Sequence, residues 1–163
     1  MSLLIAYLAV FVLAATPWLE VLLVVPAGIV AGLPAVPTVA VATVGNVATL
    51  IPVVYAGDRI RAWWRRRRGR DVPATSARSG RAARVFDRYG LPGLALLGPL
   101  LTGVHVAALV GIAAGAPRRA SVVWLSAGVA VWAAIAAVAT VVGIDAFVDT
   151  ERVPDVVDGL GVG

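Results

Sequence analysis

Two ionisable side chains lie inside long apolar stretches of this sequence, and both could take part in chemistry. Glu20 is the first acidic residue and begins the stretch 18–34, whereas His105 is the only histidine and lies within 91–117. A carboxylate among apolar residues is costly to bury, so Glu20 is a candidate for proton or cation coupling. The alternative is a surface carboxylate favoured by the dipole at a helix N-terminus. His105 could relay protons near neutral pH, or it could satisfy a buried carbonyl.

Further polar residues accompany these two along the chain. Thr43, Asn46 and Thr49 recur at intervals of three residues, so they share one face of a helix. They would either line a polar path or form hydrogen bonds between helices. Thr102 and Gly103, just before His105, suit an unwound turn. The candidate pathway residues from these patterns are Glu20, Asn46, Thr102, Gly103 and His105.

The residue types needed for several other chemistries are missing. Cysteine is absent and histidine occurs once, so neither a disulfide framework nor a thiolate or histidine-rich metal site can form. No nucleophile with a neighbouring base, no phosphate-binding loop and no pair of catalytic carboxylates can be assembled. We therefore expect no enzymatic activity, no metal and no cofactor.

The composition indicates a membrane protein. Hydrophobic residues make up 60% of the 163 residues and charged residues 14%, and the mean hydropathy is +0.92. A soluble domain of this size leaves much of its surface in water and cannot hide so much apolar area. A helix needs about 20 mainly apolar residues to span the hydrocarbon core. We predict one membrane domain, 1–148, from the stretches that approach or exceed this length: 3–16, 18–34, 36–57, 91–117 and 120–148.

The basic residues mark one side of the membrane. All fourteen are arginine, and most of them fall between Arg59 and Arg88. Such a block beside an apolar segment is a cytoplasmic topology signal rather than a nucleic-acid site. Two tryptophans precede four consecutive arginines, a pattern that suits contact with anionic lipid headgroups. The predicted headgroup contacts are Trp63, Trp64, Arg65, Arg66, Arg67 and Arg68.

An internal repeat relates two parts of the sequence. A shift of 83 residues places 28–45 over 111–128 without gaps, and seven of the eighteen positions are identical. The matches include glycines and a proline that are spaced alike. Each half then contains an apolar segment interrupted by Gly and Pro, a tight turn and an uninterrupted helix. Paired interrupted segments in two halves of a membrane protein point to a transporter-like core.

The charges of the loops decide between two topologies. Arg118 and Arg119 follow the stretch 91–117, and the arginine block precedes it. If this stretch spans the membrane, the two basic loops lie on opposite sides; if it is re-entrant, both are cytoplasmic, as the positive-inside rule favours. We predict an all-α polytopic fold with two inverted repeats, each a re-entrant helix hairpin plus a transmembrane helix. The predicted parts are repeat halves 18–57 and 91–145, a cytoplasmic arginine-rich loop 58–90, and an external acidic tail 149–163.

The two interrupted segments resemble the DedA-like (SNARE-associated, VTT) membrane superfamily. They read LEVLLVVPAGIVAGLP and RYGLPGLALLGPLLTGVHVAALVGIAAGAP, and the closer match is the branch of small multidrug export proteins. The resemblance covers roughly 18–145 and implies two facing re-entrant hairpins, with lipid translocation or proton-coupled export of small molecules as the role. The arginines that the superfamily carries around the proline of the second segment are absent here. Carried over, the resemblance points to Glu20, Pro26, Pro99, Thr102 and Gly103.

Together these observations predict a multi-pass transporter of the DedA-like type in a prokaryotic inner (plasma) membrane. It would export small molecules or translocate lipid, and proton coupling would involve Glu20 and His105, which we expect to approach each other or a shared cavity where the two segments turn. The alternative is a membrane structural or interaction protein without transport activity. A polar midplane favours transport, whereas a dry, packed midplane favours the structural role. Expected partners are membrane lipids with anionic headgroups and a small-molecule or lipid substrate; nucleic acid is not expected, and self-association is left open.

Overall fold

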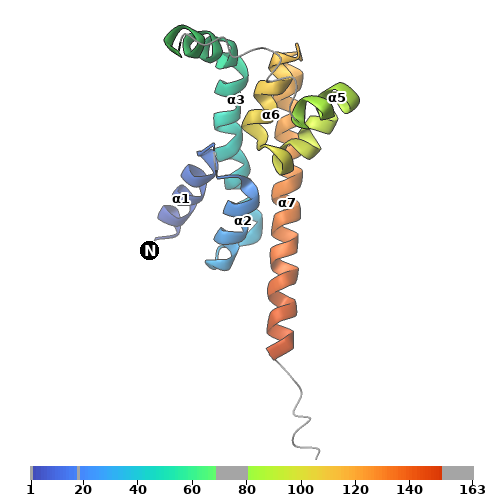
Figure 1. Ribbon diagram of the computed structural model, residues 1–163. Coiled ribbons are helices and arrows are strands. Elements are labelled where there is room, and N and C mark those ends of the chain that lie inside the picture. Colours follow the sequence, from blue (N-terminus) through green and yellow to red (C-terminus); the bar gives the residue numbers. More distant parts are fainter. Residues whose placement is uncertain (1, 18, 69–80, 152–163) are drawn as a thin grey trace, which may run out of the picture.

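All regular secondary structure in the part that the structure describes is helical. The computed structural model describes residues 2–17, 19–68 and 81–151, and the side chains of 58, 60–68, 81–82 and 147–151 lie outside this description. The predicted all-α class is confirmed. The helices, shown in Figure 1, are α1 (Leu3–Ala15), α2 (Val21–Val30), α3 (Ala35–Arg68), α5 (Arg81–Leu101), α6 (Val104–Ala113) and α7 (Arg118–Glu151).

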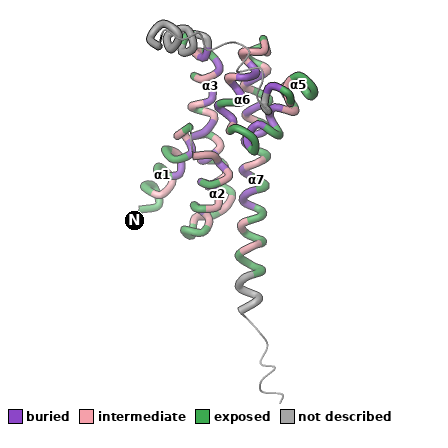
Figure 2. The backbone as a smooth tube through the Cα atoms, viewed as in Figure 1, coloured by how far each residue is buried: buried purple, intermediate pink, exposed green. Residues whose placement is uncertain are grey.

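Two of these helices are long and apolar enough to cross a membrane. The candidate spans are Ala35–Gly57 within α3 and Arg118–Ala146 within α7, with hydropathies of 1.8 and 2.2. Only 28% of the apolar window of each span is buried inside the chain, and Figure 2 shows the largely unburied lower part of α7. The core helix of a soluble protein would be buried on most sides. The exposed apolar surface therefore indicates a membrane protein whose long helices face lipid.

The other apolar helices are too short to cross alone. α1 has 13 residues, and α2 and α6 have 10 each. At about 1.5 Å per residue they are roughly 15–20 Å long, against a hydrocarbon core of roughly 30 Å. The candidate spans accordingly do not include α1. α1 ends before Pro17 because proline cannot continue a helix.

An elbow at Gly90 divides α5 into two arms. Gly90 has φ 63° and ψ −154°, a conformation that is essentially restricted to glycine. Gly93 lies against Tyr89 and Val85 of the first arm, where a side chain would have no room. The first arm, 81–89, is helical, as its amphipathic sequence predicts.

The predicted arginine-rich loop is helical at both of its ends. α3 continues to Arg68, and α5 begins at Arg81, so only the residues between them lie outside the described helices. Arginine is a good helix former, and nothing in the sequence between Asp58 and Arg68 breaks a helix. The helix was expected to end with the hydrophobic residues, at 57, but residues of good helix propensity extend it to Arg68.

Local structure recurs at the spacing of the sequence repeat. A shift of 83 residues converts the bounds of α2 into those of α6 and the bounds of α3 into those of α7. Gly32 and Gly115, in the turns before the long helices, both have φ 90°. The hydroxyls of Thr38 and Ser121 each donate to the carbonyl four residues earlier, at 2.7 and 3.0 Å. The similarity in sequence is therefore accompanied by a similarity in backbone conformation.

Helix packing follows the same correspondence. α1 packs on α3 as α5 packs on α7, while α2 packs on α7 as α6 packs on α3. α3 and α7 also contact each other. In Figure 1 the α1–α2 hairpin and the α5–α6 hairpin approach from opposite ends of the molecule, and their closed ends meet near the middle. This arrangement brings the residues just before α2 and just before α6, Glu20 and Gly103, together between the long helices.

Candidate functional site

Glu20 connects the two hairpins at their breaks. Its carboxylate oxygen Oε1 accepts a hydrogen bond of 2.9 Å from the backbone N–H of Val104, the first residue of α6. Gly103 lies directly beside this bond, since a Cβ atom there would be 2.7 Å from the same oxygen. Residue 103 also has φ 84°, a backbone conformation that favours glycine. Glycine is therefore required here both by the backbone conformation and by the lack of room for a side chain. A carboxylate from the first hairpin thus occupies the beginning of the broken helix of the second.

The contact joins equivalent positions of the repeat. Glu20 is the N-cap residue of α2, but its side chain makes no capping bond to that helix. It caps α6 instead, whose own N-cap residue is Gly103 and has no side chain to offer. The first N–H groups of a helix lack partners within the helix, so this bond satisfies a donor that would otherwise be unpaired. A shift of 83 residues places Glu20 on Gly103, so the N-termini of α2 and α6 meet at one carboxylate.

His105 follows Val104 and extends the polar contact to α3. Its Nε2 atom lies 3.0 Å from the Thr49 hydroxyl, and that hydroxyl donates to the carbonyl of Asn46 at 3.0 Å. The hydroxyl has a single proton, so the tautomer of His105 decides which partner donates: an Nε2-protonated ring donates to Thr49, and an Nδ1-protonated ring accepts from it.

Several buried polar atoms in these elements have no hydrogen-bond partner within the described residues. Asn46 is fully buried, and both polar atoms of its side chain are unpaired. Buried polar groups without partners are costly and rare in native structures. Such a set can bind water, a cation or the polar part of a substrate. The unpaired atoms are Glu20 Oε2, Thr43 Oγ1, Asn46 Oδ1 and Nδ2, His105 Nδ1 and Ser126 Oγ.

The remaining predicted pathway residues lie on the same two hairpins. Pro26 is half-buried inside α2, where it removes one backbone donor, and Pro99 is buried in the second arm of α5. Thr102 is exposed at the break, and its N–H donates to the carbonyl of Gly98 at 3.0 Å. Where the described residues are concerned, no three His, Asp or Glu side chains converge to hold a metal ion. The side chains of the predicted headgroup contacts, Trp63, Trp64, Arg65, Arg66, Arg67 and Arg68, lie outside the described residues.

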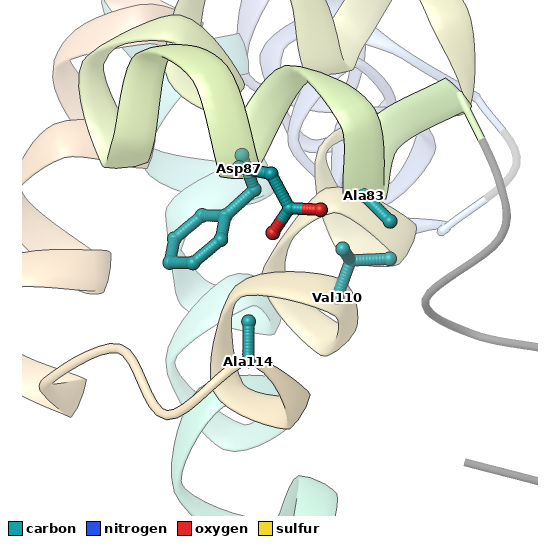
Figure 3. A pocket seen from close by; sticks show the side chains of 5 residues that line it. Ala83, Asp87, Val110 and Ala114 are labelled. Carbon is teal, nitrogen blue, oxygen red and sulfur yellow. The ribbon is translucent and has the colours of Figure 1, made fainter. Parts of the chain in front are cut away.

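Two pockets lie beside the first arm of α5. One of about 310 Å³ separates this arm from α6, and Figure 3 shows Asp87 beside it with Ala83, Val110 and Ala114. The other, of about 340 Å³, has Arg84, Val85, Arg88, Tyr89 and Leu101 in its wall. Neither pocket is lined by Glu20 or His105, and the sequence analysis predicted neither of them because both depend on the elbow of α5.

The fold and the site define a class of protein, a helical membrane protein in which two broken-helix hairpins pack against two long apolar helices. The family model described as "Putative small multi-drug export protein" matches residues 20–135, more than two thirds of the chain, and the chain belongs to this family. The match begins at Glu20 and extends into α7. No curated protein and no solved structure matches the chain.

The structure brings Glu20 to Val104, the residue before His105. The sequence pattern singled out Glu20 and His105 as candidates near the two turns. It did not predict the backbone partner of Glu20 or the pairing of Thr49 with His105. A signal for the first contact was present: extension of the gapless repeat toward the N-terminus places Glu20 on Gly103.

Proposed function

We propose that this chain is a membrane transporter that exports small molecules, with Glu20 and the break before α6 as its central site. The observation that carries the proposal is the 2.9 Å hydrogen bond from the Val104 N–H to the Glu20 carboxylate. It joins an ionisable group to the end of a broken helix, and transporters bind substrates and coupling ions at such ends. Membership of the small multi-drug export family supports export as the direction of transport.

In this proposal the two halves form an inverted repeat, and each hairpin enters and leaves the membrane on one side. Exchange of α1 with α5, α2 with α6 and α3 with α7 leaves the pattern of helix packing unchanged, as a pseudo-two-fold axis requires. α3 and α7 run in opposite directions in Figure 1. The first half then includes α1, so it begins earlier than the boundary at residue 18 that the sequence suggested. Packing of both breaks against α3 and α7 would keep their backbone groups away from lipid.

Proton coupling is the driving force that we propose. Glu20 has a second, unpaired carboxylate oxygen that can accept a proton. Protonation would weaken the hydrogen bond with Val104, because a charged acceptor binds an N–H more strongly than a neutral one. A weaker bond would let the two hairpins separate, which would link proton binding to the exchange between inward-open and outward-open states.

We assign no enzymatic activity to this site. Thr49 lies beside His105 in the arrangement of a nucleophile and a base. No third group orients His105 as a base, because its Nδ1 has no hydrogen-bond partner within the described residues. We further propose a multi-pass protein of a prokaryotic plasma membrane, with a cytoplasmic arginine-rich segment in contact with anionic lipids.

The test is flux through the purified chain in proteoliposomes, with and without a proton gradient, for a panel of fluorescent drugs and labelled lipids. The lipid arm tests translocation of the DedA-like type. We expect gradient-dependent flux for the native chain and background flux for Glu20→Gln, which keeps the size of the side chain but cannot ionise. Asp145→Asn is the matched control, because Asp145 is an exposed acid on α7, and its flux should be unchanged.

Two outcomes would contradict the proposal. If folded and inserted Glu20→Gln shows unchanged proton-dependent flux, Glu20 only anchors the hairpins to each other. If the native chain transports no drug and no lipid under any gradient, the alternative of a membrane structural protein is favoured. That alternative leaves the unpaired side chain of Asn46 in the core without a role.

A further inference from the structure

The two arms of α5 form a shallow, open basic pocket that the proposed transport site at Glu20 does not include. The two arms fold close together because Gly90 has φ 63° and Gly93 has no side chain between them. Leu101, at the end of the second arm, therefore comes near residues of the first arm. The wall of this pocket, of about 340 Å³, consists of Arg84, Val85, Arg88, Tyr89 and Leu101.

Both arginines of the elbow are available to a ligand. Arg84 and Arg88 are exposed and lie four residues apart, so they share one face of the arm. The guanidinium carbon of Arg88 lies 5.4 Å from the ring centroid of Tyr89, a cation–π contact that holds it in place. Neither arginine pairs with a carboxylate in the described part of the chain. Asp87, the acid between them, lines the other pocket, on the α6 side of the arm.

The basic pocket continues into an apolar strip. Leu97 and Leu101 lie one turn apart on the second arm, and each is 38% exposed. Val85 adds an apolar wall on the first arm. Two positive charges next to exposed leucines match a molecule with an anionic head and an apolar tail. Guanidinium groups are suited to phosphate, because their N–H donors bind its oxygens in pairs.

We infer that the elbow of α5 binds one anionic phospholipid, with its phosphate between Arg84 and Arg88 and an acyl chain along Leu101 and Leu97. The site is separate from the Glu20 junction and from the headgroup contacts predicted at 63–68. It lies next to the break, since Leu101 precedes Thr102 and Gly103 directly. A bound lipid would therefore hold the closed end of the α5–α6 hairpin in place.

The test measures binding to the full chain, purified in maltoside detergent without lipid, by microscale thermophoresis. The probes are dioctanoyl phosphatidylglycerol, dioctanoyl phosphatidylcholine and inorganic phosphate. Phosphatidylglycerol should bind at least about tenfold more tightly than phosphatidylcholine. Each arginine contributes about 1 kcal/mol of attraction to an anionic lipid, and a difference of 1.4 kcal/mol in binding free energy is a tenfold difference in affinity.

The variants locate the site. Arg84→Gln with Arg88→Gln should abolish this preference, whereas Arg118→Gln with Arg119→Gln, two exposed arginines at the start of α7 outside both the pocket and the arginine-rich segment, should keep it. Leu101→Ala should lower the affinity for phosphatidylglycerol severalfold. If the first double variant does not fold, judged by its thermal unfolding, the two single substitutions carry the test, each with a loss of about fivefold.

Three results would overturn the inference. An equal loss in both arginine pairs would mean general charge attraction rather than a site. Equal binding of the two lipids would mean that the charge is not recognised. If inorganic phosphate binds as tightly as phosphatidylglycerol, the pocket is a site for a soluble anion, and the leucines have no role in binding.

Discussion

At the scale of single residues, Gly103 meets both a backbone and a steric requirement for glycine. It combines φ 84° with a place where a Cβ atom would lie 2.7 Å from Glu20 Oε1. We predict that Gly103→Ala destabilises the chain by about 2–4 kcal/mol, because it adds backbone strain of about 1–3 kcal/mol to the loss of the Glu20 contact. Thermal unfolding in detergent measures the loss, and transport should fall with it.

Gly115 provides the matched control for this substitution. It has φ 90°, and nothing lies within 4 Å of the place where its Cβ atom would be. Gly115→Ala therefore reports the backbone strain alone, and we expect a smaller loss of stability, about 1–2 kcal/mol. If the two substitutions cost the same, the contact of Glu20 with the break contributes nothing to stability.

The pair of Thr49 and His105 gives a second residue-scale prediction. Thr49→Val keeps the shape of the side chain but leaves His105 Nε2 without its partner. We expect Thr49→Val and His105→Leu each to destabilise the chain, and the double-mutant cycle to give a coupling energy of about 1 kcal/mol. The measurement is unfolding of the two single variants and the double variant in detergent. A coupling energy near zero would mean that the 3.0 Å contact does not persist in the folded state.

At the scale of helices, two glycines set the closest approaches between elements. Gly45 of α3 lies against the backbone carbonyl of Phe11 on α1, and Gly128 of α7 lies against that of Ala95 on α5. These positions are equivalent in the repeat, and a Cβ atom at either would overlap with backbone that cannot move independently. We predict that Gly45→Ala and Gly128→Ala each destabilise the chain by about 1–3 kcal/mol.

Gly143 of α7 is the control for both glycines. Nothing lies within 4 Å of the position of its Cβ atom, so Gly143→Ala should be neutral or stabilising by up to about 1 kcal/mol through better helix propensity. Thermal unfolding of the three variants side by side separates helix packing from helix propensity. Destabilisation by Gly143→Ala alone would contradict the packing described for α3 and α7.

The helices could be predicted from sequence where hydrophobicity and breakers agree. α2 and α6 follow from apolar segments that end at glycine and proline, and the repeat predicted that they would be alike. The elbow of α5 could not be predicted, because Gly90 within RYGLPG gives no sign of which conformation it adopts. α1 is apolar throughout, as the sequence predicts, but its 13 residues make it shorter than a helix that spans the hydrocarbon core alone.

At the scale of the whole molecule, the sequence predicts candidate residues for a site but not their geometry. The scarcity of ionisable groups singled out Glu20 and His105, because burial of such groups is costly in a membrane. Their contacts depend on how two hairpins dock between α3 and α7, and docking is decided by packing that sequence patterns do not encode. The basic pocket of the elbow escaped prediction for the same reason, since Leu101 and Arg84 are brought together only by the fold.

The proposed inverted repeat predicts that two equivalent turns lie on opposite sides of the membrane. Pro34 and Pro117 are both exposed, each directly precedes a long helix, and the chain has no cysteine. A membrane-impermeant maleimide should label Pro34→Cys in intact cells and Pro117→Cys only after permeabilisation, because Arg118 and Arg119 keep the second turn in the cytoplasm. The cysteine-free chain gives the background. Labelling of both turns from one side would contradict the inversion. If only Pro117→Cys is labelled in intact cells, the two halves are still inverted but the protein has the opposite orientation in the membrane, since the pseudo-two-fold axis relates the turns in either case.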